Sequence, residues 1–94
     1  MIHVAGDRVE VSGAMILSEA SKLLAEGSAT LASAETLFDL SAVTDVDSSS
    51  IAVIFGWLRA AQQQGKAIRI AHPPQELLSL SSVYGVTELL PLAA

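Results

Sequence analysis

The spacing of apolar residues along the chain predicts the order of its elements. Short segments in which apolar residues dominate or alternate with polar ones are typical of strands, and apolar residues three and four positions apart are typical of helices. The strands expected on this basis are residues 2–5, 8–12, 36–40 and 67–71. The expected helices are residues 14–26, 49–64 and 75–84, and residues 86–92 are expected to form a short final strand or an extended tail.

Strands that are separated by helices need crossover connections, and crossovers produce parallel neighbours. Gly6 and Asp7 separate the first two strands and predict a hairpin, which is antiparallel. Residues 36–40 are nearly all apolar, as expected for a central strand that is buried on both faces, and residues 41–47 are expected to be a connection. The pattern predicts an α/β fold in one small domain, residues 1–94, with a mixed sheet and helices packed on one side.

The segment from Asp47 to Ser50 lies where the second helix is expected to begin. Asp and Ser cap helix N-termini, because their oxygens accept hydrogen bonds from the unpaired N–H groups of the first turn. Three successive serines exceed what one cap requires. We therefore expect one serine to cap the helix, with Asp47 as an alternative second cap, and the surplus hydroxyls to be either solvated surface or a binding site.

Composition and charge exclude several classes of function. The chain has 94 residues, of which 51% are hydrophobic, and a net charge of -5. An acidic chain is poorly suited to nucleic acid or to an anionic membrane surface, since both attract basic proteins. No apolar run approaches the roughly 20 residues of a membrane span, and no signal peptide is recognised. A cytoplasmic protein without direct membrane insertion is expected.

The sequence also lacks the motifs of common catalytic and cofactor sites. It contains no cysteine, and its two histidines, His3 and His72, are not spaced as metal ligands. The glycine-rich nucleotide-binding motifs and the G-x-S-x-G motif of hydrolases do not occur. We therefore expect neither a metal nor a cofactor, and no enzymatic activity.

The second expected helix is apolar on most of its circumference, so either both of its flanks are buried, or one is buried and the other contacts a partner. Phe55 and Trp57 are two residues apart and cannot share one helix face. Phe55 is assigned to the core. Trp57 can belong either to the core or to a partner contact, and it is included among the expected partner-binding residues because Trp is enriched at binding hot spots.

The order of these motifs resembles the STAS domain family over about residues 4–92. Within that family, the length, the N-terminal hairpin and the C-terminal segment resemble the small STAS subunits of Mla-type phospholipid ABC transporters. The segments that carry the resemblance are Asp39-Leu40-Ser41, Val46-Asp47-Ser48-Ser49, Ile51-Ala52-Val53-Ile54, Gln64-Gly65-Lys66, Leu80-Ser81-Ser82-Val83-Tyr84-Gly85-Val86 and Leu89-Leu90-Pro91.

The resemblance implies a non-enzymatic subunit that docks on the MlaF-like ATPase of the transporter, and through it on the membrane permease. It also implies association with the inner membrane through that complex, in phospholipid transport that maintains outer-membrane lipid asymmetry. The docking surface of the family includes the hydroxyl just after the strand-end Asp, which is Ser48 here. The partner-binding residues expected are Asp47, Ser48, Ser49, Ser50 and Trp57.

A second branch of the family implies a different role. Anti-sigma factor antagonists are phosphorylated at the second hydroxyl after the Asp, which is Ser49 here, and their partners are an anti-sigma factor and a serine kinase. Those proteins commonly carry Gly at the next position, where this chain has Ser50. A phosphate on Ser49 would be favoured by the helix N-terminus but repelled by Asp45 and Asp47.

Overall fold

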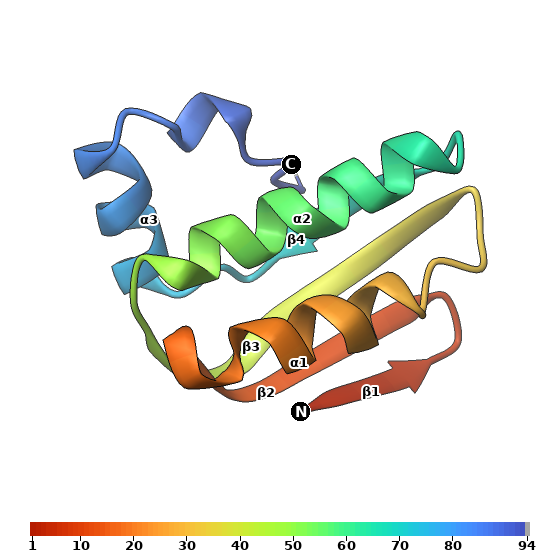
Figure 1. Ribbon diagram of the computed structural model, residues 1–94, viewed down its shortest axis with the longest axis horizontal. Coiled ribbons are helices and arrows are strands. Elements are labelled where there is room, and N and C mark those ends of the chain that lie inside the picture. The colour runs from red at the N-terminus through yellow and green to blue at the C-terminus, as the bar shows by residue number, and fades with distance from the viewer. Residues whose placement is uncertain (94) are drawn as a thin grey trace.

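The computed structural model describes residues 1–93, which form a four-stranded sheet, three α-helices and a short 3-10 helix. The strands are β1 (Ile2–Ala5), β2 (Arg8–Met15), β3 (Glu35–Val46) and β4 (Ala67–Ala71). The helices are α1 (Leu17–Ser28), α2 (Ser49–Gln63), α3 (Gln75–Val83) and the 3-10 helix η1 (Thr87–Leu89). Figure 1 shows their arrangement.

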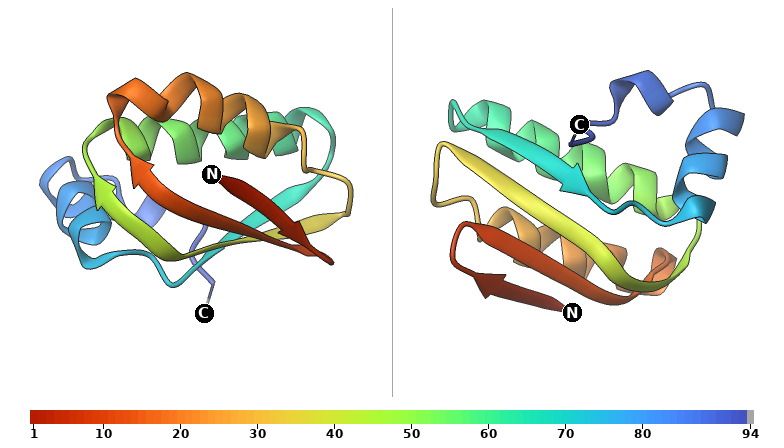
Figure 2. Two further views of the ribbon diagram at one scale, coloured as in Figure 1. Left: turned by 90° about the horizontal axis from the view of Figure 1, so that it is seen from below. Right: turned by 180° about the vertical axis from the view of Figure 1, so that it is seen from behind.

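The sheet has the order β1-β2-β3-β4, in which β1 and β2 are antiparallel and the other neighbours are parallel. The connections β2-α1-β3 and β3-α2-β4 are the crossovers that parallel strands require. Figure 2 shows that α1 and α2 lie side by side on one face of the sheet, while α3 lies at its end. The predicted α/β fold, with a mixed sheet and helices on one side, is confirmed.

The core lies between the sheet and the two long helices. Its strand residues alternate with exposed or half-exposed neighbours along β2 and β4, which places them on the helix-covered face. The core residues of the strands are Val9, Val11 and Met15 of β2, Phe38 and Leu40 of β3, and Ile68 and Ile70 of β4. The indole of Trp57 from α2 stacks on Phe38, with ring centroids 4.3 Å apart and planes within 6°. The stacked pair therefore joins the central strand to the central helix.

Two strands are longer than the sequence pattern predicts. β3 continues through most of the expected connection at residues 41–47, because its second half pairs with the second half of β2. Ser12 is opposite Ala42 and Met15 is opposite Val46, with two irregularities in the register between β2 and β3. The side chains in this part of β3 are mostly exposed, so the apolar pattern gave no sign of a strand.

The boundaries of α1 and of the C-terminal segment also differ from the prediction. α1 begins at Leu17 rather than Ala14, because β2 extends to the buried Met15. Gly27 does not end the helix but is buried within it. After η1, the chain forms an isolated parallel bridge between Leu92 and Ile70, so the tail covers part of the outer edge of β4.

Candidate functional site

The helices α1, α2 and α3 all begin at one edge of the sheet, where the parallel strands β2, β3 and β4 end (Figure 1). In α/β folds this edge is the usual place for binding, since helix N-termini present unpaired N–H groups there. The turn from β3 into α2 contains Asp47 and Ser48. The hydroxyl cluster predicted from the sequence therefore lies at this edge.

Asp47 holds the starts of two helices together. Its Oδ1 accepts hydrogen bonds from the backbone N–H of Ser49, at 2.9 Å, and from the Ser49 hydroxyl. Its Oδ2 accepts the N–H of Leu17, the first residue of α1, at 3.0 Å. The Ser49 hydroxyl and the N–H groups of Leu17 and Ser49 lower the pKa of this carboxyl below its ordinary value. Asp47 thus supplies the cap that we expected from a serine.

The three serines differ in what their hydroxyls contact. Ser50 is fully buried, and its Oγ donates a hydrogen bond to the carbonyl of Asp47 at 2.7 Å. Its assignment to the partner-binding residues is therefore wrong, since its hydroxyl is used inside the fold. Ser49 is half-buried and bound to Asp47. Ser48 is exposed, and within residues 1–93 its side chain makes no capping hydrogen bond, so its hydroxyl is available to a partner.

Trp57 is a core residue, and its assignment as a partner contact is wrong. Its side chain is 0% exposed, and its Nε1 donates a hydrogen bond to the carbonyl of Leu23 at 3.0 Å. Gly27 in α1 lies directly against the indole, where a side chain would overlap it. The assignment failed because helical spacing shows which residues share a face but not which face meets the sheet. Phe55, which we assigned to the core, is half-buried and packs against the core.

The solvent-facing side of α2 forms a stripe that begins at Ser48. Positions spaced by three and four residues along a helix lie on one side of it. The residues of this stripe, all exposed or half-exposed, are Ser48, Ala52, Phe55, Arg59 and Gln62. The helical spacing of these residues could be recognised in the sequence, but the partial exposure of Phe55 could not be inferred from it.

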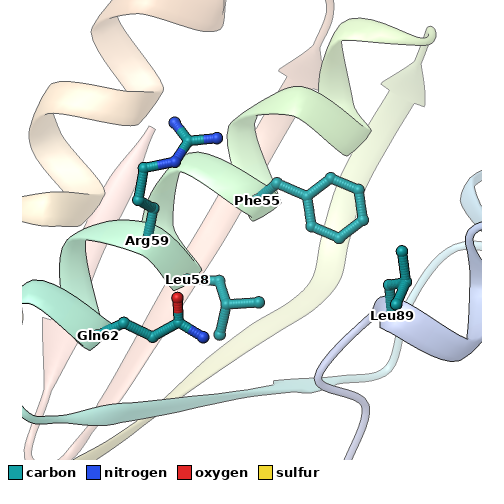
Figure 3. Close-up of a pocket in the computed structure, with 5 residues that line it drawn as sticks. All are labelled: Phe55, Leu58, Arg59, Gln62 and Leu89. Carbon is teal, nitrogen blue, oxygen red and sulfur yellow. The ribbon is translucent and has the colours of Figure 1, made fainter.

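A groove of about 340 Å³ lies beside this stripe. Phe55, Leu58, Arg59 and Gln62 of α2 line one wall, and Leu89 of η1 lines the other (Figure 3). Leu89 is 62% exposed, and Phe55 and Leu58 are half-buried. Sequence reasoning missed this groove, because it depends on how the C-terminal segment folds back beside α2.

A second polar cluster lies around Asp39 in the middle of β3. Asp39 is 6% exposed, and its Oδ1 accepts the N–H of Ser41 at 2.9 Å and lies 3.3 Å from Nδ1 of His72. Arg8 Nη1 lies 3.7 Å from the other carboxylate oxygen. The Ser41 N–H is the main cause that lowers the pKa of Asp39, and His72 lowers it further, while burial opposes them. The sequence did not indicate this cluster.

Over residues 1–93, no group of three or more His, Cys, Asp or Glu side chains is placed to hold a metal ion. The structure pairs His72 with Asp39, at a distance of 3.3 Å. None of the helices in the described chain combines the length and hydrophobicity that a membrane span requires. The chemistry available at the edge of the sheet is the exposed hydroxyl of Ser48, beside the carboxylate of Asp47.

Solved structures with low sequence identity to this chain share its fold, and two of them are described as anti-sigma factor antagonists. A Thermotoga maritima protein described as an anti-sigma factor antagonist has a TM-score of 0.76 at 15% identity, covering 98% of this chain and 83% of its own. The anti-sigma factor antagonist SpoIIAA, in its unphosphorylated form, has a TM-score of 0.68 at 12% identity, covering 100% of this chain and 86% of its own. At such identities the likeness concerns the fold.

Similarity in sequence gives a narrower assignment. The chain is 31% identical over 51 residues to the intermembrane phospholipid transport system binding protein MlaB of Haemophilus influenzae. That match covers 54% of this chain and 49% of the relative, about half of its length. Residues 2–91 match the family described as "Mlab, STAS domain". Since this match spans nearly all of the described residues, the chain belongs to the MlaB-type STAS domain family.

Proposed function

We propose that this protein is a non-enzymatic STAS subunit that docks on the MlaF-like ATPase of an Mla-type phospholipid ABC transporter. It stabilises or regulates that complex on the cytoplasmic side of the inner membrane. The single observation that carries the proposal is the exposed hydroxyl of Ser48, which the fold leaves unused at the start of α2. The family assignment and the MlaB relative support the identity of the partner.

The surroundings of Ser48 suit contact with a protein. Leu17, whose N–H is bound to the same Asp47 that precedes Ser48, is 76% exposed although it is a large apolar residue. An exposed hydroxyl and an exposed apolar side chain, on two segments bound to one carboxylate, provide the mixture of hydrogen bonding and apolar burial that protein interfaces use. Because Asp47 holds the starts of α1 and α2 together, both groups are presented without loss of backbone entropy on binding.

The alternative function, an anti-sigma factor antagonist switched by phosphorylation of Ser49, meets an unfavourable geometry. The Ser49 hydroxyl donates its hydrogen bond to Asp47, so a phosphate there would replace that bond with repulsion between two anions. The same change would disturb the carboxylate that binds Leu17. Incubation with ATP and a serine kinase that phosphorylates anti-sigma factor antagonists, followed by mass spectrometry, tests this alternative. Stoichiometric phosphate on Ser49 would favour it over docking on the ATPase.

The docking proposal is tested by pull-down of the MlaF-like ATPase from the same organism. Ser48→Glu should abolish the pull-down, because a charge without a partner would be desolvated at the interface. Ser48→Ala should weaken it only mildly, and Ser33→Glu, at an exposed serine outside this edge, serves as the matched control. Circular dichroism establishes that each variant is folded. Normal recovery of the ATPase by folded Ser48→Glu would contradict this surface.

A further inference from the structure

We infer that the docking footprint continues from Ser48 along α2 into the groove beside η1, where it takes an apolar side chain of the ATPase flanked by a carboxylate. This inference rests on the proposed function, since it names the chemistry of the same partner. The stripe is continuous with the proposed interface, because Ser48, Ala52, Phe55 and Arg59 follow one another at helical spacing on the solvent side.

The groove provides the apolar part of this contact. In Figure 3 the side chains of Phe55 and Leu58 point from α2 toward Leu89 on η1, and the three enclose an open apolar space. The groove has a volume of about 340 Å³ and is open to solvent on one side, so a side chain of another protein can enter it. Burial of such an anchor in a preformed groove is the usual source of affinity at protein interfaces.

Arg59 provides the charged part of the contact. Within the described residues, Arg8 and Arg69 form ion pairs with carboxylates, whereas Arg59 is exposed and takes part in none of these pairs. Figure 3 shows its guanidinium extending away from Leu89, so a carboxylate that binds it would lie on the rim rather than in the groove. A guanidinium binds a carboxylate through two parallel hydrogen bonds, which gives this rim contact a preferred geometry.

The location is tested by cross-linking in the complete complex with the ATPase. Because the chain contains no cysteine, Leu89→Cys creates a single thiol that can carry a maleimide-benzophenone cross-linker. Val4→Cys, on β1 and 54% exposed, is the matched control. We expect Leu89→Cys to capture an ATPase peptide that contains an apolar residue and an Asp or Glu, and Val4→Cys to capture none.

The energetics are tested by titration of the same ATPase with charge variants. Arg59→Glu should weaken binding by roughly tenfold or more, whereas Lys22→Glu, which makes the same charge change at an exposed site on α1, should weaken it less than about threefold. Leu89→Ala should also weaken binding, by about tenfold, and Val4→Ala should not. All four residues are at the surface, so the variants are expected to fold.

The outcomes separate this inference from the proposed function. If the wild type binds the ATPase and Ser48→Glu does not, but Arg59→Glu and Leu89→Ala bind as their controls do, the groove inference is overturned and the docking proposal stands. If the wild type does not bind the ATPase, both are overturned. Capture of a second copy of this chain by Leu89→Cys would also overturn the inference, since the groove would then join two identical subunits.

Discussion

Gly27 is the position at which the packing of the two long helices can be tested most directly. A methyl group there would overlap Nε1 and Cε2 of Trp57 and lie 2.9 Å from Cζ2, whereas carbon atoms in normal contact are about 3.5 Å apart. The indole is 0% exposed and stacked on Phe38, so it can move away from such a methyl group only by disturbing the core. Gly27→Ala should therefore separate α1 from α2 or displace Trp57.

The expected magnitude is a balance of opposing contributions. Ala favours a helix over Gly by up to about 1 kcal/mol, and less near a helix end. Overpacking of a core costs about 1–3 kcal/mol, and loss of the Trp57–Leu23 hydrogen bond would cost about 1 kcal/mol more. Gly27→Ala should accordingly lower the free energy of unfolding by about 1–3 kcal/mol. Urea denaturation, followed by circular dichroism and by the fluorescence of Trp57, measures this change.

Gly56→Ala is the matched control, since it also places a methyl group between α1 and α2. That methyl would overlap Cδ1 of Leu24, the end of a flexible side chain that is 37% exposed and can rotate into solvent. Gly56→Ala should therefore change the free energy of unfolding by no more than about 1 kcal/mol in either direction. A Gly27→Ala variant as stable as wild type, or more stable, would refute the proposed contact with Trp57.

The remaining predictions concern the core and the buried carboxylate. Trp57→Ala should cost about 3–5 kcal/mol of stability but leave the folded fraction able to bind the ATPase, and Phe55→Ala should cost less than half as much; denaturation curves that reverse this order would return Trp57 to the surface. The pKa of Asp39 lies below its ordinary value of 3.8, so its stabilising contribution is complete above that value and is lost as the pH falls through the lower pKa of the folded state. The free energy of unfolding of Asp39→Asn should therefore fall less than that of wild type between pH 7 and pH 3. Urea midpoints that fall equally for both proteins would contradict a stabilising role of the Asp39 carboxylate.

The element order could be predicted from sequence because the apolar spacing changes where strands give way to helices. The second half of β3 could not, because it is held by backbone pairing with β2 while its side chains stay largely in solvent. Such a strand has neither alternation nor a continuous apolar run. The second half of β3 is a strand because it pairs with β2, and not because of its own pattern of apolar residues.

The candidate site could be located from sequence, but the roles of its residues could not. A run of Asp and Ser before an apolar helix marks a helix start wherever it occurs. Which hydroxyl remains free depended on Asp47, whose second oxygen is used by α1, thirty positions earlier in the chain. Likewise, the complete burial of Trp57 depended on the rotation of α2 about its axis, which the space left by Gly27 helps to set.

The contact between Asp47 and α1 has a consequence for the order of folding. Ile16 provides no side-chain cap for α1, so the first N–H of that helix relies on a carboxylate that follows it by 30 residues. This bond can form only after β3 has paired with β2, since Met15 and Val46 at the ends of those strands bring the two residues together. We expect the first turn of α1 to remain frayed in the folding transition state, and to close only as β2, α1 and β3 complete their packing.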